Sequence, residues 1–295
     1  MKAAAENQYA GITGRTRLGC LLGSPVAHSI SPMMYNETFR LLGLDLVYLC
    51  FDTREADLGR LVSSLKEMNV FGFNLTMPDK ERILPYLDDL TPAARMIGAV
   101  NTVKNENGRL IGHNTDGVGY FRSLKDFHCP IKGIEMTLLG AGGAASSIAI
   151  QAALDGVSCL HIVNRKGRSW KNALRLAETI NAQTACRAEV VAFEERDRLR
   201  ECLAKSTLLT NATSVGMAPH ADASPIEDSS WLHPDLFVSD IIYNPRQTVL
   251  LKEAEQRGCR VGNGMYMLLY QGEAAFHFWT GMEMPVEEIR SKFFC

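Results

Sequence analysis

The 295-residue sequence lacks the features of a metal-binding or disulfide-stabilised protein. It has no CxxC pair and no HxxxH pair, and its eight cysteines are scattered singly along the chain. Structural zinc sites and small disulfide frameworks need closely spaced ligands or paired cysteines. We therefore expect no metal ion and reduced thiols at all eight positions, which are Cys20, Cys50, Cys129, Cys159, Cys186, Cys202, Cys259 and Cys295.

Long hydrophobic runs are also missing. Gly, Ser or a charged residue interrupts every apolar stretch before the roughly 18 residues that a membrane-spanning helix needs. The first 17 residues contain no apolar core of the kind found in secretory signals. We expect a cytoplasmic protein with no membrane partner.

No excess of one charge is present. The chain has 31 Lys and Arg against 33 Asp and Glu, a net charge of −2, so no overall field favours a nucleic-acid backbone. Hydrophobic residues at 46% and charged residues at 22% are typical of a globular protein. The length corresponds to about two domains.

What the sequence does contain is short apolar runs that alternate with segments of helical period, the pattern of an α/β protein. In the first third, strands are expected at residues 17–23, 47–51 and 71–76, and helices at 32–42, 54–67 and 79–97. Alternating residues around Asn107-Gly108 predict a hairpin. A connecting helix is expected directly after it.

A second series of strands follows, at residues 134–140, 159–164, 188–193, 207–212 and 236–242, each separated by a helix-length segment. This arrangement predicts a Rossmann-like, doubly wound nucleotide-binding domain over 116–264. The N-terminal α/β domain would cover 1–115. Two further helices, over about 265–295, are expected to return to that first domain.

A glycine-rich turn joins the first strand of the second series to its helix. Gly140, Gly142 and Ala145 have the GxGxx[G/A] spacing of a dinucleotide-binding loop. Gly140 would permit the tight turn, Gly142 would let a pyrophosphate approach the backbone, and the helix N-terminus would hold the anion. The alternative is a structural glycine turn that binds no nucleotide.

The next strand ends without the acidic residue that an NAD site places on the ribose. Asn164 is followed there by Arg165, Lys166, Gly167 and Arg168. Guanidinium and ammonium groups suit a 2′-phosphate, so the sequence favours NADP. The alternative is an exposed basic turn.

In the first domain, Ser31 is a natural N-cap and Pro32 a natural first helical residue, with Gly43 ending the helix. Ser29 and Ser31 also place two hydroxyls beside a helix N-terminus, which can receive a carboxylate. Capping and anion binding both remain open.

Lys80 follows a predicted strand, and Asp116 stands where the two domains join. A lysine held beside a carboxylate can relay a proton, whereas lone lysines and aspartates are usually solvated. The sequence does not show whether they meet.

Together these motifs resemble the shikimate dehydrogenase family, and within it the quinate/shikimate dehydrogenase subgroup. The matching pieces, in family order, are GSPVAHSISP, NLTMPDK, GAVNTV, GHNTDGVG, GAGGAA, NRK, TNATSVGM and MLLYQG. The resemblance implies a substrate domain and a nucleotide domain facing across a cleft. It also implies reversible hydride transfer between NAD(P) and shikimate or quinate, with their 3-dehydro forms as products, in aromatic amino acid biosynthesis.

The resemblance carries roles onto individual residues. Lys80 would exchange the proton of the reacting hydroxyl, and Asp116 would bind a ring hydroxyl and orient the lysine. The substrate-binding residues it implies are Ser29, Ser31, Thr76, Lys80, Asn101, Asp116, Tyr243 and Gln271. The cofactor-binding residues it implies are Gly140, Ala141, Gly142, Gly143, Ala144, Asn164, Arg165, Lys166, Gly167, Arg168, Ser214, Ile241 and Gly264.

Two positions depart from the family pattern. Gly167 stands where the subgroup usually has an aspartate for the ribose of NAD, so we expect NADP to be preferred and NAD to be the alternative cofactor. The second departure is expected at Tyr266, within Gly264-Met265-Tyr266-Met267, in the loop where the family has its GxGM run. Its side chain would either narrow the nicotinamide pocket or pack outward.

Two other functions remain as alternatives to a shikimate or quinate dehydrogenase. One is a dehydrogenase of another hydroxylated cyclic acid, and the other is a catalytically weak NADP-binding regulatory protein of the same fold. For assembly, an early edge strand would allow two copies to pair as a homodimer.

Overall fold

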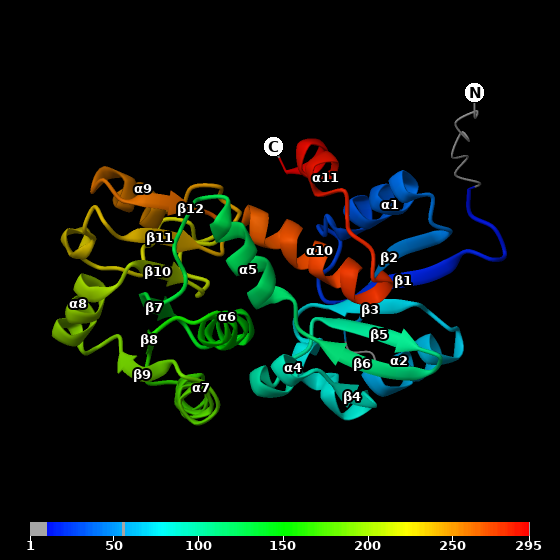
Figure 1. Cartoon of the computed structure of the whole chain (residues 1–295), viewed down its shortest axis with the longest axis horizontal. Coiled ribbons are helices and arrows are strands. Elements are labelled where there is room, and N and C mark those ends of the chain that lie inside the picture. The colour runs from blue at the N-terminus through cyan, green and yellow to red at the C-terminus, as the bar shows by residue number, and fades with distance from the viewer. Residues whose placement is uncertain (1–10, 55–56, 295) are drawn as a thin grey trace. The chain divides into compact units, whose positions relative to one another are not determined.

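The computed structural model describes residues 11–54 and 57–294, which form two compact units (Figure 1). The first unit holds the chain up to Thr115 and from Gly272 onward, and the second holds Asp116–Gln271. Three expectations fall partly or wholly outside the described residues. They concern the absence of a signal core in residues 1–17, positions 55–56 of the helix expected over 54–67, and the thiol of Cys295.

The sheet of the first unit has six strands in the order β2-β1-β3-β5-β6-β4. Their bounds are β1 Arg17–Gly23, β2 Leu46–Asp52, β3 Gly72–Leu75, β4 Asp89–Leu90, β5 Thr102–Glu106 and β6 Arg109–His113. β1 runs parallel to β2 and β3, whereas β5 runs antiparallel to β3 and β6. Asn107 and Gly108, both at positive φ, join β5 to β6, which confirms the predicted hairpin.

The helices of the first unit are α1 Ser31–Leu42, α2 Leu58–Glu67, α3 Asp79–Arg82, α4 Pro92–Ile97 and α11 Val286–Phe293, together with the later part of α10 Met265–Thr280. Gly43 ends α1 in the left-handed conformation, as predicted. The single helix expected over 79–97 is wrong. A short 3₁₀ turn at Leu84–Tyr86 and the strand β4 divide this segment, because Pro85 and Pro92 each lie in the first turn of a new element.

Both faces of this sheet are covered. On one face α2 and α4 bury a hydrophobic core that includes Val62, Leu65 and Phe73. On the other face α1 and α10 bury aromatic rings, among them Tyr35 and Trp279, whose ring centroids are 5.2 Å apart. The indole nitrogen of Trp279 donates to the carbonyl oxygen of Val103 at 2.9 Å.

The second unit has a six-stranded sheet in the order β12-β11-β10-β7-β8-β9, with every pair parallel. The strands are β7 Glu135–Leu139, β8 Cys159–Asn164, β9 Arg187–Ala192, β10 Leu208–Asn211, β11 Phe237–Asp240 and β12 Arg260–Gly262. The helices are α5 Asp116–Lys125, α6 Gly143–Leu154, α7 Trp170–Gln183, α8 Arg196–Lys205 and α9 Val249–Gln256, with the 3₁₀ turn Ser229–Trp231.

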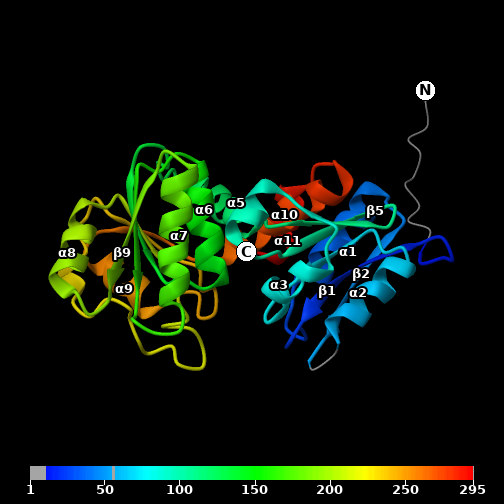
Figure 2. The same ribbon diagram turned by 90° about the horizontal axis from the view of Figure 1, so that it is seen from below.

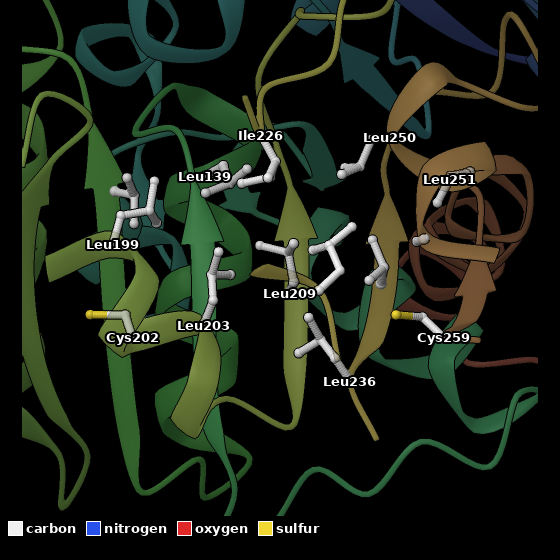
Figure 3. Close-up of a cluster of buried hydrophobic side chains, with 14 of the residues drawn as sticks. Leu139, Leu199, Cys202, Leu203, Leu209, Ile226, Leu236, Leu250, Leu251 and Cys259 are labelled. Carbon is white, nitrogen blue, oxygen red and sulfur yellow. The ribbon is translucent and has the colours of Figure 1, made fainter. Parts of the chain in front are cut away.

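The helices of this unit lie on both faces of its sheet. α6 and α7 lie side by side (Figure 2), and α8 and α9 pack on the strands through buried residues such as Leu203, Leu209 and Leu250 (Figure 3). The strand order reverses between β7 and β10, and a parallel sheet leaves a ligand-binding crevice at that point. This is the predicted Rossmann-like, doubly wound fold.

No helix in residues 11–54 or 57–294 is both long and apolar enough to span a bilayer. Both units have the α/β fold class, since each contains a sheet covered by helices. The alternation of apolar runs and helical segments predicts this class.

Candidate functional site

Lys80 lies on the short helix α3, and the surrounding contacts fix its backbone. The carboxylate of its neighbour Asp79, fully buried, accepts from the hydroxyl of Thr53 and from the guanidinium of Arg82, both at 2.8 Å. The carbonyl oxygen of Lys80 accepts from the N–H of Val100 at 2.8 Å. The position of Lys80 is thus determined by its own helix and by the segment that leads into β5.

Asn101 lies one residue beyond that contact and is almost fully buried. Its side chain donates to the hydroxyl of Thr115 at 3.0 Å and accepts from the N–H of Thr115 at 2.9 Å. The side-chain nitrogen of Asn74 donates to the carbonyl oxygen of Asn101, also at 3.0 Å. This polar network holds the chain immediately before Asp116, which begins α5.

The two predicted anion-binding serines lie at the start of α1. The structure places Ile30 at the N-cap, with Ser31 as the first helical residue and Pro32 as the second. The expectation that Ser31 caps the helix is therefore wrong. Instead, the hydroxyl of Ser29 accepts from the N–H of Ser31 at 3.2 Å, because the loop turns one residue earlier than the Ser-Pro spacing suggests.

The remaining predicted substrate residues are Thr76, Gln271 and Tyr243. Thr76 follows β3 and is partly exposed, and its N–H donates to the carbonyl oxygen of Leu22 at 2.9 Å. Gln271 lies within α10, and its side chain donates to the carbonyl oxygen of Leu268 at 3.0 Å. Tyr243 follows β11 and is 39% exposed.

The predicted substrate residues are divided between the units. Ser29, Ser31, Thr76, Lys80 and Asn101 belong to the first unit, and Asp116, Tyr243 and Gln271 belong to the second.

The glycine-rich turn after β7 has the geometry that a dinucleotide loop requires. Gly140 has a φ of +103°, and a Cβ there would lie 2.9 Å from the carbonyl oxygen of Ala212. Gly142 is the N-cap of α6, and a Cβ at Gly142 or Gly143 would enter open space. Only glycine fits at the first position, while the next two leave room for a ligand close to the backbone.

A cavity of about 420 Å³ opens above this turn, entirely within the second unit. Its lining residues are Gly140, Ala141, Gly142, Asn164, Arg165, Ser169, Phe193, Ala212, Thr213, Ser214, Val215, Ser224, Pro225 and Glu227. It therefore combines the turn, the end of β8 and the loop after β10.

The predicted cations differ in their placement. Arg165 lines the cavity. Lys166 is exposed, 3.7 Å from Glu195 and over the ring of Trp170. Arg168 is exposed and is absent from the cavity lining. Arg165 is the cation best placed to meet a ligand in this cavity.

Gly143 and Ala144 lie in the first turn of α6. Ile241 and Gly264 are in direct contact, because a Cβ at Gly264 would collide with the carbonyl group of Ile241. Tyr266 is a partly exposed residue in the first turn of α10. The backbone at Gly264 therefore tolerates no side chain. The GxGM run is intact as Gly262-Asn263-Gly264-Met265, so the expectation that Tyr266 departs from it is wrong.

Several polar residues that hold the nucleotide loops in place belong to none of the sequence motifs and are therefore not predicted from the sequence. The side chain of Asn172, on α7, donates to the carbonyl oxygen of Ala141 at 2.7 Å. Asn211 accepts from the N–H of Thr213 at 3.0 Å and donates to the carboxylate of Asp240 at 3.1 Å. Burial raises the pKa of Asp240. For Asn211 and Asp240, the signal in the sequence is a polar side chain at the end of a buried strand, whereas Asn172 lies on a helix and has no such signal.

Comparison with known proteins gives a consistent result. Residues 21–103 match the shikimate dehydrogenase substrate binding domain, and residues 264–292 match the shikimate 5′-dehydrogenase C-terminal domain. The NADP⁺-dependent shikimate dehydrogenase of Listeria monocytogenes serotype 4b is 47% identical over 283 residues, which are 96% of this chain and 97% of that protein.

Solved structures agree. Shikimate 5-dehydrogenase from Listeria monocytogenes, in complex with shikimate and NAD, has a TM-score of 0.93 at 47% identity, covering 96% of this chain and 98% of that one. Quinate dehydrogenase from Corynebacterium glutamicum, in complex with NAD, has a TM-score of 0.84 at 30% identity, covering 94% and 98%. With 47% identity over nearly its whole length and the same two-unit α/β architecture, this chain belongs to the shikimate dehydrogenase family.

Proposed function

We propose that this chain catalyses the reversible, NADP-dependent interconversion of 3-dehydroshikimate and shikimate. The observation that carries this proposal is the 47% identity to an NADP⁺-dependent shikimate dehydrogenase across 96% of the chain. The retention of Lys80, Asp116, Asn101 and Gln271 in the family's motifs supports it. The first unit and the two C-terminal helices, about 265–295, then bind the substrate, and residues 116–264 bind the cofactor.

The turn after β7 fits a dinucleotide. The N-terminus of α6 presents unbonded N–H groups beside Gly142, where no side chain obstructs an approaching pyrophosphate. Arg165 supplies a guanidinium on the same cavity for a 2′-phosphate. When bound, the nicotinamide ring takes up or delivers the hydride.

The cavity lining also includes one carboxylate, that of Glu227, whose partner is the guanidinium of Arg196. This ion pair moderates the repulsion that an isolated carboxylate would exert on a phosphate. We therefore retain NADP as the preferred cofactor and NAD as the second.

In the proposed mechanism Lys80 is the acid–base group. As the substrate is oxidised, its reacting hydroxyl gives a proton to Nζ of Lys80, and the lysine returns it in the reverse direction. Asp116 binds a ring hydroxyl and orients that lysine. General acid–base catalysis of this kind supplies about 10²- to 10⁴-fold of the rate.

The other residues position the ring. Ser29 and Ser31 receive the substrate carboxylate at the N-terminus of α1, with Tyr243 near the same group. Thr76, Asn101 and Gln271 hydrogen-bond to its oxygen atoms. The hydroxyl oxygen of Ser29 accepts from the N–H of Ser31, and its hydrogen can be donated to an anion.

Quinate is the second substrate that we propose to test, because the chain is 30% identical to a quinate dehydrogenase and shares its fold. Quinate carries an extra hydroxyl on the carbon that bears the carboxylate, so the site must accommodate or bond that group. Acceptance of another hydroxylated cyclic acid would likewise depend on whether the site accommodates or hydrogen-bonds its hydroxyl groups.

A catalytically weak NADP-binding regulator is the competing function, and Tyr266 motivates it. Steady-state assays with a panel of ring acids separate the two. Turnover of shikimate supports the dehydrogenase, and tight NADP binding with no turnover of any ring acid supports the regulator.

We further propose a cytoplasmic homodimer. β2 is an edge strand of the first sheet, and its Leu49 and Phe51 are 46% and 39% exposed. An open edge with outward apolar side chains can pair with a second copy. Light scattering on the wild type and on Leu49→Lys tests this assembly. A monomeric wild type overturns it.

A further inference from the structure

A cluster of potential metal ligands lies in the second unit, away from the nucleotide loop. Its first members are Glu135, Cys159 and His161, whose ligand atoms all lie within 4.8 Å of one another. They stand on neighbouring parallel strands, since Glu135 begins β7 and pairs with Cys159, which begins β8. His161 follows two residues after Cys159, so its side chain is on the same face of the sheet.

The spacing of these atoms suits one tetrahedral ion. Nε2 of His161 is 3.3 Å from Oε2 of Glu135 and 3.9 Å from Sγ of Cys159. With metal–ligand distances of about 2.0–2.3 Å, a tetrahedral zinc ion separates nitrogen from oxygen by about 3.4 Å and nitrogen from sulfur by about 3.6 Å. Small side-chain movements would complete the geometry.

The other ring nitrogen of His161 is already occupied. Nδ1 lies 2.7 Å from Oε1 of Glu189, and both oxygens of that carboxylate accept from the guanidinium of Arg198 at 2.8 and 3.0 Å. A metal-ligating histidine almost always gives its second N–H to such an acceptor, which fixes the tautomer and raises ligand basicity. Here the supporting carboxylate is itself held in place.

A second candidate group, made by His161, Glu189 and Cys202, fits less well. The 2.7 Å separation on the Nδ1 side is a hydrogen-bond distance, shorter than two ligands of one tetrahedral ion require. The guanidinium of Arg198 also hydrogen-bonds to both carboxylate oxygens of Glu189. Cys202, on α8, closes this face of the sheet against the hydrophobic core (Figure 3).

With the proton on Nδ1, the lone pair of Nε2 faces the carboxylate oxygen of Glu135. Two acceptors at 3.3 Å need a cation or a proton between them. His161 and Cys159 are each 3% exposed, whereas the side chain of Glu135 is 34% exposed and offers a path for an ion. We propose that Glu135, Cys159 and His161 bind one Zn²⁺-class ion, with Glu189 as the positioning residue and water in the fourth position.

This ion would stabilise the fold rather than take part in hydride transfer. The cluster lies at the amino ends of β7 and β8, whereas Gly140 follows the carboxyl end of β7, roughly 15 Å away along a strand of this length. An ion there ties two strands together and shields their buried polar side chains.

The test uses the full-length chain, stripped with a chelator and titrated separately with ZnCl₂ and CoCl₂. We expect about one ion per chain, a rise in melting temperature on adding Zn²⁺, and a thiolate-to-cobalt charge-transfer band with Co²⁺. Shikimate turnover should not change on adding Zn²⁺, so failure of this site and failure of the proposed activity are distinguishable.

Variants locate the ion. Cys159→Ser should abolish the charge-transfer band, and Glu135→Gln should weaken Zn²⁺ binding at least tenfold. Glu189→Gln should weaken it about 10- to 100-fold while keeping the band. The matched controls, Cys129→Ser and Glu178→Gln, replace a buried cysteine and an exposed glutamate of the same unit, and should bind like the wild type.

If Cys159→Ser does not fold, the two glutamate variants decide the question. The proposal is overturned by the absence of saturable binding, which would leave His161 as a hydrogen-bonding partner of two carboxylates. Cobalt binding without the charge-transfer band, or equal affinity in the glutamate variants and the controls, also overturns it.

Discussion

The side chain of Asn101 hydrogen-bonds to Thr115 in both directions, from Nδ2 to the hydroxyl oxygen at 3.0 Å and from the Thr115 N–H to Oδ1 at 2.9 Å. Asn101 precedes β5 and Thr115 follows β6, so this contact closes the end of the hairpin. Thr115 is the residue before Asp116. The contact therefore fixes the chain that presents the proposed catalytic carboxylate.

Asn101→Ala should lower both stability and turnover. It leaves the buried Thr115 N–H without its partner, which costs about 1–3 kcal/mol of unfolding free energy, and it releases the backbone before Asp116. Urea denaturation and steady-state kinetics measure the two effects. Thr115→Ser keeps the hydroxyl and should resemble the wild type. Unchanged stability in Asn101→Ala would show that the contact is unimportant.

Lys80→Ala should reduce kcat by at least about 100-fold, because it removes the group that exchanges the substrate proton. Near-normal turnover in this variant would disprove the assignment. Lys66→Ala is the matched control, since Lys66 is a surface lysine of the first unit paired with Asp88 at 3.1 Å. It should retain wild-type turnover.

Gly140→Ala should lower the stability of the fold, whereas Gly142→Ala should weaken cofactor binding. At Gly140 a methyl group is forced into positive φ and against the carbonyl oxygen of Ala212, so the variant should melt at a lower temperature. At Gly142 the methyl group meets open space, so the variant should fold normally and bind NADP at least tenfold more weakly. Thermal denaturation and cofactor titration separate them. Equal behaviour of the two variants would contradict this geometry.

Arg165→Ala should raise the KM for NADP by about 10- to 100-fold, the value of one charge-assisted hydrogen bond to phosphate. The KM for NAD should change little, because NAD has no 2′-phosphate. Arg168→Ala, outside the cavity lining, is the control and should have a smaller effect. A similar loss for both cofactors would mean that Arg165 does not read the 2′-phosphate.

Acidification should destabilise the first unit through His113. Burial lowers the pKa of this imidazole to about 4, and the ring lies 2.8 Å from the hydroxyl of Thr91. Because the unfolded chain binds the proton near pH 6.5 and the folded chain does not, stability falls as pH drops from about 6.5 towards 4. Between pH 7 and pH 5 the expected loss is about 2 kcal/mol.

Chemical denaturation at both pH values measures this loss. His113→Gln should lose less stability than the wild type on acidification, and His220→Gln, at an exposed site, should match the wild type. An equal pH dependence in all three proteins would exclude His113 as the group responsible.

The sequence predicts the second unit better than the first, for a physical reason. Five strands of the parallel sheet contain a short apolar run, and the glycine spacing of the turn after β7 is typical of a nucleotide loop. The sixth, β12, Arg260–Gly262, is too short to give such a signal. In the first unit, the segment from Asp79 to Ile97 has helical composition throughout. Pro85 and Pro92 and the pairing of β4 with β6 divide it, and pairing partners are invisible to local periodicity.

The candidate site divides in the same way. Gly140, Gly142 and Arg165 could be placed because loop position and residue type together define a nucleotide site. Asn172 and Asp240 could not, because their partners, Ala141 and Asn211, are brought to them only by the packed fold. At α1, the N-cap is Ile30 rather than Ser31, a one-residue difference that the loop conformation decides, and the hydroxyl of Ser29 accepts from the N–H of Ser31.

Steady-state kinetics of the wild type with shikimate and quinate, each with NADP and NAD, decide whether this chain is the proposed dehydrogenase. We expect turnover of shikimate, with a higher kcat/KM for NADP than for NAD. No turnover in any of the four combinations would contradict the proposed enzyme, and a higher kcat/KM for NAD would contradict the role given to Arg165.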